Sequence, residues 1–244
     1  MQHQIAVNPH TGQIFMKGAV VKLHLPMAVV RHGETDGVLK HVLQGQVDAS
    51  ENQLNAMGRK QARETACRLL TDLERRFGQN ELVDFARTGK LVILTSPLTR
   101  ARDTADIFLD TFQNQTGLLL QTQIEQGLRE VSFGSYDGCA LADIDDEHFK
   151  QLVINYRTAQ NATIDWQGSG ESFLDVMMRA AGLVKSLNKN FREKIILAFT
   201  HGTFISALRA VLGDRRLVRT DGMIAFRDHI LAPGQSFWFD EISI

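Results

Sequence analysis

The 244-residue chain has few of the features that mark secreted, membrane or nucleic-acid-binding proteins. Its two cysteines, Cys67 and Cys139, are too few for a disulfide framework and favour a reducing, cytoplasmic setting. No apolar run approaches the ~18 residues of a membrane span, and the N-terminus lacks the pattern of a signal peptide. With a net charge of −1, the chain lacks the overall positive charge that would attract nucleic acid. We therefore expect neither nucleic acid nor membrane as a partner, and any anion site must be built locally.

Proline is also scarce, with four residues, and no linker rich in proline, glycine or serine divides the chain. The first residues stand slightly apart, because "QIAVNPHTGQIFM" places two short apolar runs around a turn, which predicts a β-hairpin. We interpret residues 1–26 as an appended β-ribbon and residues 27–244 as the main domain. The ribbon could extend a sheet, cover a site or mediate dimerisation, so a homodimer is left open.

The main domain alternates between strand-like and helix-like patterns. Apolar runs predict strands at 26–30, 90–94, 118–125, 194–199, 222–226 and 236–242. Apolar residues at helical spacing predict helices at 54–77, 98–112, 146–159 and 172–191, and one more that ends at 212. This alternation predicts an α/β fold, a three-layer α/β/α sandwich with a mostly parallel central sheet.

Polar residues come directly after the three most apolar strands. Arg31 and His32 come after "AVV", "TSPLTR" with Arg100 comes after "LVIL", and His201 comes after "IILAF". The carboxyl ends of parallel strands share one edge of a sheet, where ligands bind near helix N-termini. Each residue alone is more typical of a structural role. Together, two arginines and two imidazoles at one edge favour a phosphoryl site.

The motifs occur in an order that resembles a known family. These are "RHGET" (31–35), "LQG" (43–45), "SPLTRARDTA" (96–105), "LREVSFGSYDG" (128–138), "GES" (170–172) and "THG" (200–202). The chain from about residue 27 onward is similar to the histidine phosphatase superfamily, the phosphoglycerate mutase-like family. The resemblance implies a phosphoglycerate mutase-like fold, to which the N-terminal hairpin is an addition.

The resemblance also implies roles for particular residues. His32 would attack phosphorus and become phosphorylated, and Glu130 would donate a proton to the leaving group. That acid must hold a proton part of the time, which burial or the substrate's negative charge would favour. Glu34 and Asp137 are weaker alternatives for the acid. The residues expected to bind the phosphoryl group are Arg31, Arg100, His201, Thr35, Gln44 and Gly45.

Two departures from the family pattern concern the shape of the pocket. Val38 stands where many relatives carry asparagine, which removes an amide donor. The segment 47–58, "VDASENQLNAMG", is longer than the usual spacing. Neither departure changes the expected fold, but both leave the choice of substrate open.

The expected function is hydrolysis of a small phosphorylated metabolite through a phosphohistidine. In related mutases an arginine comes after the catalytic glutamate, whereas here Arg129 precedes Glu130. A phosphoglycerate mutase is therefore the first alternative, and a catalytically weak phospho-ligand-binding protein is the second. No metal or other cofactor is expected, because arginines and histidines supply the positive charge.

Overall fold

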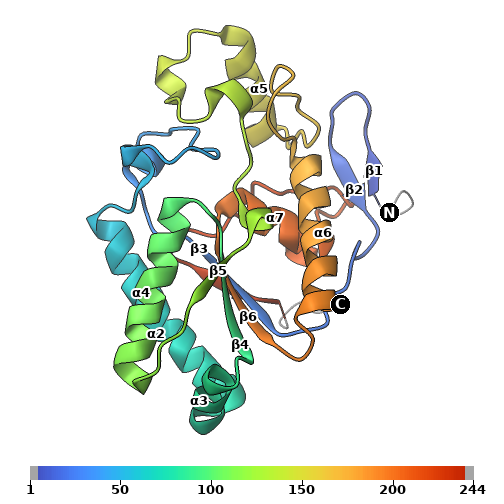
Figure 1. Cartoon of the computed structure of the whole chain (residues 1–244). Coiled ribbons are helices and arrows are strands. Elements are labelled where there is room, and N and C mark those ends of the chain that lie inside the picture. Colours follow the sequence, from blue (N-terminus) through green and yellow to red (C-terminus); the bar gives the residue numbers. More distant parts are fainter. Residues whose placement is uncertain (1–4, 240–244) are drawn as a thin grey trace.

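A five-stranded sheet lies at the centre of the protein, whose computed structural model describes residues 5–239 (Figure 1). The strand order is β5-β4-β6-β3-β7. Four strands are parallel and β7 is antiparallel to β3. This arrangement confirms the predicted, mostly parallel sheet. The strands are β3 (Met27–Arg31), β4 (Leu91–Thr95), β5 (Thr122–Ile124), β6 (Ile195–Thr200) and β7 (Ser236–Trp238).

Helices cover both faces of the sheet and confirm the three-layer sandwich (Figure 1). Alternate residues of β3 enter different cores, because side chains along a strand point to opposite faces. Val30 packs with α2 and α4, whereas Val29 packs with α6 and α7. The longer helices are α2 (Ala56–Phe77), α3 (Gln79–Arg87), α4 (Thr99–Thr116), α5 (Glu147–Thr158), α6 (Phe173–Asn190) and α7 (Gly202–Val211).

Side-chain caps fix where the main helices begin. The Asn55 side chain accepts a hydrogen bond of 2.8 Å from the Gly58 amide in the first turn of α2. Ser172 and Asp175 form a capping box at the start of α6. The Thr99 amide and hydroxyl, at the start of α4, both donate to Asp48 at 3.0 Å. These contacts satisfy amide groups that an isolated helix leaves unpaired.

The predicted N-terminal hairpin is present. Strands β1 (Ile5–Val7) and β2 (Ile14–Met16) pair antiparallel and form a sheet of their own. Ile14 and Met16 are buried in the same apolar cluster as α6 and α7. The hairpin is thus packed onto the main core, and the boundary at residue 26 stays a prediction.

Several predicted elements differ from the observed ones. Residues 222–226 are not a strand, and Met223 and Ile224 form only isolated bridges. The strand expected at 118–125 is confined to β5, and that expected at 236–242 begins as β7, with 240–242 outside the described residues. Helix α3 was not expected. In the described part of the chain, no helix has the length and apolar character needed to cross a membrane.

Gly58 brings the first turn of α2 against the loop after β3. A Cβ atom at Gly58 would meet the Glu34 carbonyl oxygen well inside contact distance and would lie 2.7 Å from the Glu34 amide nitrogen. Gly33, in the same loop, faces the Gly58 backbone with equally little room. The absence of both side chains therefore sets how closely the loop approaches α2.

We predict that Gly58→Ala destabilises the protein, because moving the rigid backbone to admit the methyl group costs about 1–3 kcal/mol. The gain of about 0.8–1 kcal/mol in helix propensity offsets only part of this cost. Gly182→Ala is the matched control, since Gly182 is an exposed residue of α6 with nothing within 4 Å of an added Cβ, and it should stabilise. Urea unfolding of both variants measures the difference, and equal effects would contradict the steric account.

Candidate active site

The register of two central strands places two histidines side by side. Strands β3 and β6 are parallel, with Arg31 opposite Thr200, and the next amide, that of His32, donates to the Thr200 carbonyl at 3.0 Å. His32 and His201 are both buried, and their ring centroids lie 5.2 Å apart. The two histidines predicted to converge therefore do so at the carboxyl edge of the sheet.

Hydrogen bonding fixes the tautomer of His32. Its Nδ1 lies 2.7 Å from the Gly33 carbonyl oxygen, and a carbonyl only accepts, so Nδ1 carries the proton. In the neutral ring the Nε2 atom then holds the lone pair. Burial, and next the charges of Arg100 and Arg31, lower the pKa of His32 well below its usual value. The ring is thus neutral near pH 7, with Nε2 available as a nucleophile.

His201 is oriented by the end of the neighbouring strand. Its Nε2 lies 2.8 Å from the Ser96 hydroxyl, and the Ser96 amide donates to the Phe199 carbonyl at 2.9 Å. Burial and then the Arg100 charge lower the pKa of His201 well below its usual value. Its Nδ1 is buried and has no hydrogen-bond partner among the described residues. When the Ser96 hydroxyl donates to Nε2, Nδ1 carries the ring proton.

Two arginines are anchored by backbone carbonyls. Arg31 donates to the Leu231 carbonyl at 2.5 Å, and Arg100 donates to the Gly45 and Val47 carbonyls at 2.8 and 3.3 Å. Burial is the largest cause that lowers the pKa of Arg100 to about 10, at which it remains charged at neutral pH. Carbonyls orient a guanidinium group without cancelling its charge, so both arginines keep a full positive charge for an anion.

Glu130 accepts hydrogen bonds from the N-terminus of α7. Its Oε1 accepts from the Val131 and Phe204 amides at 3.0 and 3.2 Å, and its Oε2 accepts from the Thr203 amide at 3.2 Å. The unpaired amides and partial positive charge of a helix N-terminus favour a carboxyl group there. The oxygen Oε2 accepts only this one bond within the described residues, so it retains a lone pair for a transferable proton.

A second network holds the Glu130 loop. Arg179 of α6 binds Glu171 through two bonds of 2.8 and 2.9 Å and donates to the Gly127 and Arg129 carbonyls at 2.8 and 2.7 Å. The Gln46 side chain donates to both the Glu130 carbonyl and Glu171, at 2.9 and 3.0 Å. These contacts link the "GES" segment to the loop that carries the candidate acid.

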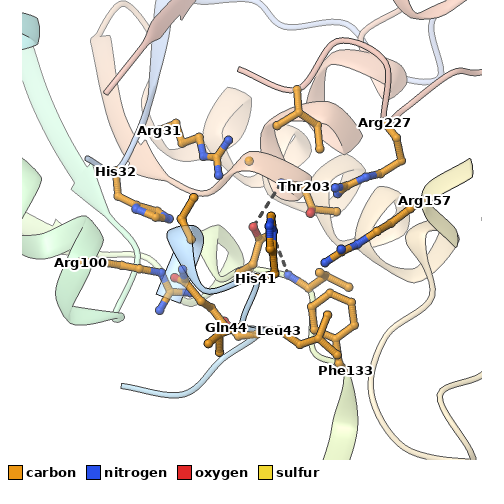
Figure 2. A pocket seen from close by; sticks show the side chains of 17 residues that line it. Arg31, His32, His41, Leu43, Gln44, Arg100, Phe133, Arg157, Thr203 and Arg227 are labelled. Atoms are coloured by element: carbon orange, nitrogen blue, oxygen red, sulfur yellow. Dashed lines mark hydrogen bonds between the residues drawn. The ribbon is translucent and has the colours of Figure 1, made fainter. Parts of the chain in front are cut away.

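A cavity of about 410 Å³ connects most of the predicted site residues (Figure 2). Thr35 and His201 do not line this cavity. The Thr35 hydroxyl lies behind its wall, where it caps α1 (Asp36–Leu39) and accepts a bond of 2.7 Å from the Gln44 side chain. The predicted residues that line the cavity are Arg31, His32, Gln44, Gly45, Arg100 and Glu130.

The alternative acids lie outside the cavity lining. The Asp137 carboxylate accepts hydrogen bonds from the Phe133 and Gln46 amides, and burial raises its pKa. Glu34 accepts a bond of 3.1 Å from the Asn55 side chain. Val38 does line the cavity, as the family comparison implied. Of the three candidate acids, Glu130 is therefore the one that lines the cavity.

The sequence did not predict that two further arginines, Arg157 and Arg227, would line the cavity. Figure 2 shows their guanidinium groups on the side of the cavity opposite to Arg31, His32 and Arg100. Neither arginine belongs to a motif. Arg157 lies within a predicted helix, and Arg227 follows the apolar run 222–226, which was not among the three strands whose ends were considered. In the described residues, no group of three or more His, Cys, Asp or Glu side chains is arranged to hold a metal ion.

Neutral imidazoles, anchored arginines and a helix-bound carboxyl group at the carboxyl edge of the sheet are typical of a protein that handles phosphoryl groups. The sequence model of the histidine phosphatase superfamily (branch 1) matches residues 27–223, and the chain belongs to this superfamily. It is 29% identical over 196 residues to a Bacillus subtilis protein named uncharacterized phosphatase PhoE, covering 80% of this chain and 81% of that protein.

Other relatives bear more specific names. The chain is 29% identical over 195 residues to a glucosyl-3-phosphoglycerate phosphatase of Mycobacterium tuberculosis, covering 76% of this chain and 74% of that protein. A structure of a mycobacterial glucosyl-3-phosphoglycerate phosphatase with VO3 superposes with a TM-score of 0.60 and 26% identity, over 88% and 92% of the two chains. A Thermus thermophilus phosphoglycerate mutase, at 22% identity and a TM-score of 0.55 over 89% and 94%, shares the fold.

We predict that His32 and His201 make stability depend on pH. The unfolded chain takes up protons on both side chains near pH 6.5, whereas burial lowers their pKa in the folded state. Below about pH 6.5 the unfolded state therefore binds more protons, and the free energy of unfolding falls as pH falls. The slope is up to about 1.4 kcal/mol per pH unit for each histidine.

Urea unfolding between about pH 7.5 and 5 measures this slope, which should be shallower in the variant His32→Asn/His201→Asn. Nitrogen-15 NMR at pH 7 should show His32 neutral with its proton on Nδ1. A charged His32 at that pH, or equal slopes for the two proteins, would show that burial does not keep these rings neutral.

Proposed function

We propose that the protein is a metal-independent phosphomonoester hydrolase that acts through a phosphohistidine at His32. The observation that carries the proposal is the hydrogen bond from His32 Nδ1 to the Gly33 carbonyl, beside two carbonyl-anchored arginines. This bond leaves the lone pair on Nε2 of a neutral ring. The names of the relatives, which include phosphatases, support the same reaction class.

In the first step Nε2 of His32 forms a bond to phosphorus and the bond to the ester oxygen breaks. The leaving oxygen takes a proton from Glu130 and departs as the alcohol. Arg31 and Arg100 stabilise the negative charge of the phosphoryl oxygens, and Nδ1–H of His201 can donate to one of them. The intermediate divides one difficult displacement into two easier ones.

In the second step water replaces the histidine. Water gives a proton to the Glu130 carboxylate while its oxygen bonds to phosphorus, and the P–N bond breaks with its electron pair returning to Nε2. Phosphate leaves, and both Glu130 and His32 regain their starting states. One residue acts as acid and then as base, as the two steps require.

A phosphoglycerate mutase is the second candidate. A mutase would return the phosphoryl group to a substrate oxygen and exclude water. Arg129 lies before Glu130 rather than after it, and the phosphatase names among the relatives favour hydrolysis. We also propose a cytoplasmic location, supported by Cys67 and Cys139, which are both free.

We predict that His32→Ala abolishes the release of inorganic phosphate from a panel of phosphomonoesters in EDTA, because the attacking nitrogen is lost. The wild type should release phosphate under the same conditions. His148→Ala removes an exposed histidine of α5 and should keep full activity. Equal release by wild type and His32→Ala would refute the role of His32, and restoration of activity only by a divalent ion would refute metal independence.

We predict that Glu130→Gln traps the phosphoenzyme. p-Nitrophenolate leaves without a proton, so the first step should persist, whereas hydrolysis of the intermediate should slow by about 10²–10⁴. Stopped-flow absorbance should then show a burst of p-nitrophenolate of about one equivalent per enzyme, with an acid-labile phosphohistidine in mass spectrometry. Unchanged steady-state turnover of both p-nitrophenyl phosphate and an alkyl phosphate would assign the proton to another group.

A further inference from the structure

The cavity has a second cationic end that the phosphoryl chemistry does not use. Arg157 lies in the last turn of α5, and Arg227 lies in the segment before β7. Both are partly buried and line the same cavity as His32. Figure 2 shows both guanidinium groups directed toward the centre of the cavity from the side opposite to Arg31 and Arg100.

Neither of these two arginines has an acidic partner between residues 5 and 239. No ion pair in the described residues involves Arg157 or Arg227, although arginines elsewhere in the chain pair with carboxylates. Asp228, next in sequence to Arg227, is engaged by Arg219 at 2.6 Å and by the Gln160 side chain at 2.8 Å. The charges of the pair are therefore not neutralised from within the described chain.

The two charges also oppose each other. Burial is the main cause that lowers the pKa of Arg157, and the charge of Arg227 lowers it further. Two cations held close together in a partly desolvated wall are unfavourable until an anion joins them. A carboxylate or a phosphate accepts paired hydrogen bonds from guanidinium groups and relieves this repulsion.

Apolar side chains and the polar residues His41 and Thr203 line the space between the two cationic ends. Val38, Leu43 and Phe133 line it, and the acidic side chain in the lining is Glu130, which α7 holds. A cavity of about 410 Å³ is within the range that accommodates a small organic ligand. The cavity thus has room for a compact molecule with one anionic group at each end.

We infer that Arg157 and Arg227 form a second anion subsite, so that the substrate is a small phosphomonoester with another anionic group, a carboxylate or a phosphate. This inference rests on the proposed function. The phosphoryl group to be transferred lies at His32, and the second group is bound by the arginine pair and does not react. The arginine pair determines which ester binds, and the residues at the ends of the strands carry out the reaction.

Matched substrates test the subsite. 3-Phosphoglycerate and glycerol 3-phosphate differ by a carboxylate, and fructose 1,6-bisphosphate and fructose 6-phosphate differ by a phosphate. The wild type should show a higher kcat/KM for the doubly anionic member of at least one pair. The pair with the larger ratio identifies the second group as carboxylate or phosphate. Equal kcat/KM within both pairs would overturn the inference.

Variants then assign the preference to the two arginines. Arg157→Gln and Arg227→Gln should each lower kcat/KM for the preferred substrate about 10- to 150-fold, the range for a hydrogen bond to a charged group. The singly anionic partner and p-nitrophenyl phosphate should change less than about threefold. Arg192→Gln removes the same charge from an exposed position after α6 and should change nothing. Equal losses on all substrates would show that the pair is structural.

Binding separates a failure of the subsite from a failure of the proposed function. Calorimetry on His32→Ala compares the two members of each pair without turnover. If His32→Ala still prefers the doubly anionic member and loses that preference with Arg157→Gln, the subsite stands even where no ester is hydrolysed. If p-nitrophenyl phosphate is hydrolysed but neither turnover nor binding distinguishes the pairs, the hydrolase stands and the subsite is wrong.

Discussion

The pairing of β3 with β6 is the constraint on which the site depends. Both strands are buried except at Arg31, which is partly buried at the end of β3, and their register sets Arg31 opposite Thr200. The residues that follow, His32 and His201, are therefore neighbours. The strand register brings them together and requires no direct contact between the two rings. A slip of one residue would turn each side chain to the other face of the sheet and separate the pair. The apolar core thus sets the geometry of the polar site.

The arginines at the phosphoryl end are oriented without being neutralised. Arg31 and Arg100 donate to backbone carbonyls, in contrast to Arg179, which pairs with Glu171 and holds a loop. A carboxylate partner would have cancelled the field that a phosphoryl group needs. Burial opposes these charges, as the lowered pKa of Arg100 shows, and a bound anion would offset that cost. The site therefore favours an anionic ligand before any specific contact forms.

The sequence was sufficient to predict the residues attached to the parallel strands. Strands β3, β4 and β6 are continuous apolar runs, and the residues directly after them must meet at one edge of the sheet. Residues 222–226 are also mostly apolar but form no strand, and Phe226 is buried against Phe173, with ring centroids 3.8 Å apart. Apolar character alone does not distinguish a strand from a buried loop. Arg227 comes directly after this segment, but only the residues after the three most apolar strands were considered as a site, so this end of the cavity was not predicted.

The two ends of the cavity are built in different ways, which separates chemistry from selectivity. At the phosphoryl end, the side chains are attached to the ends of sheet strands. At the other end, Arg157 and Arg227 flank an aromatic cluster in which the Tyr156 and Phe226 rings are 5.2 Å apart. The last turn of α5 favours the Arg157 charge, because carbonyls point outward at a helix C-terminus. Changes in these two segments would alter which ester fits while leaving the β3–β6 register, and thus the reacting groups, in place.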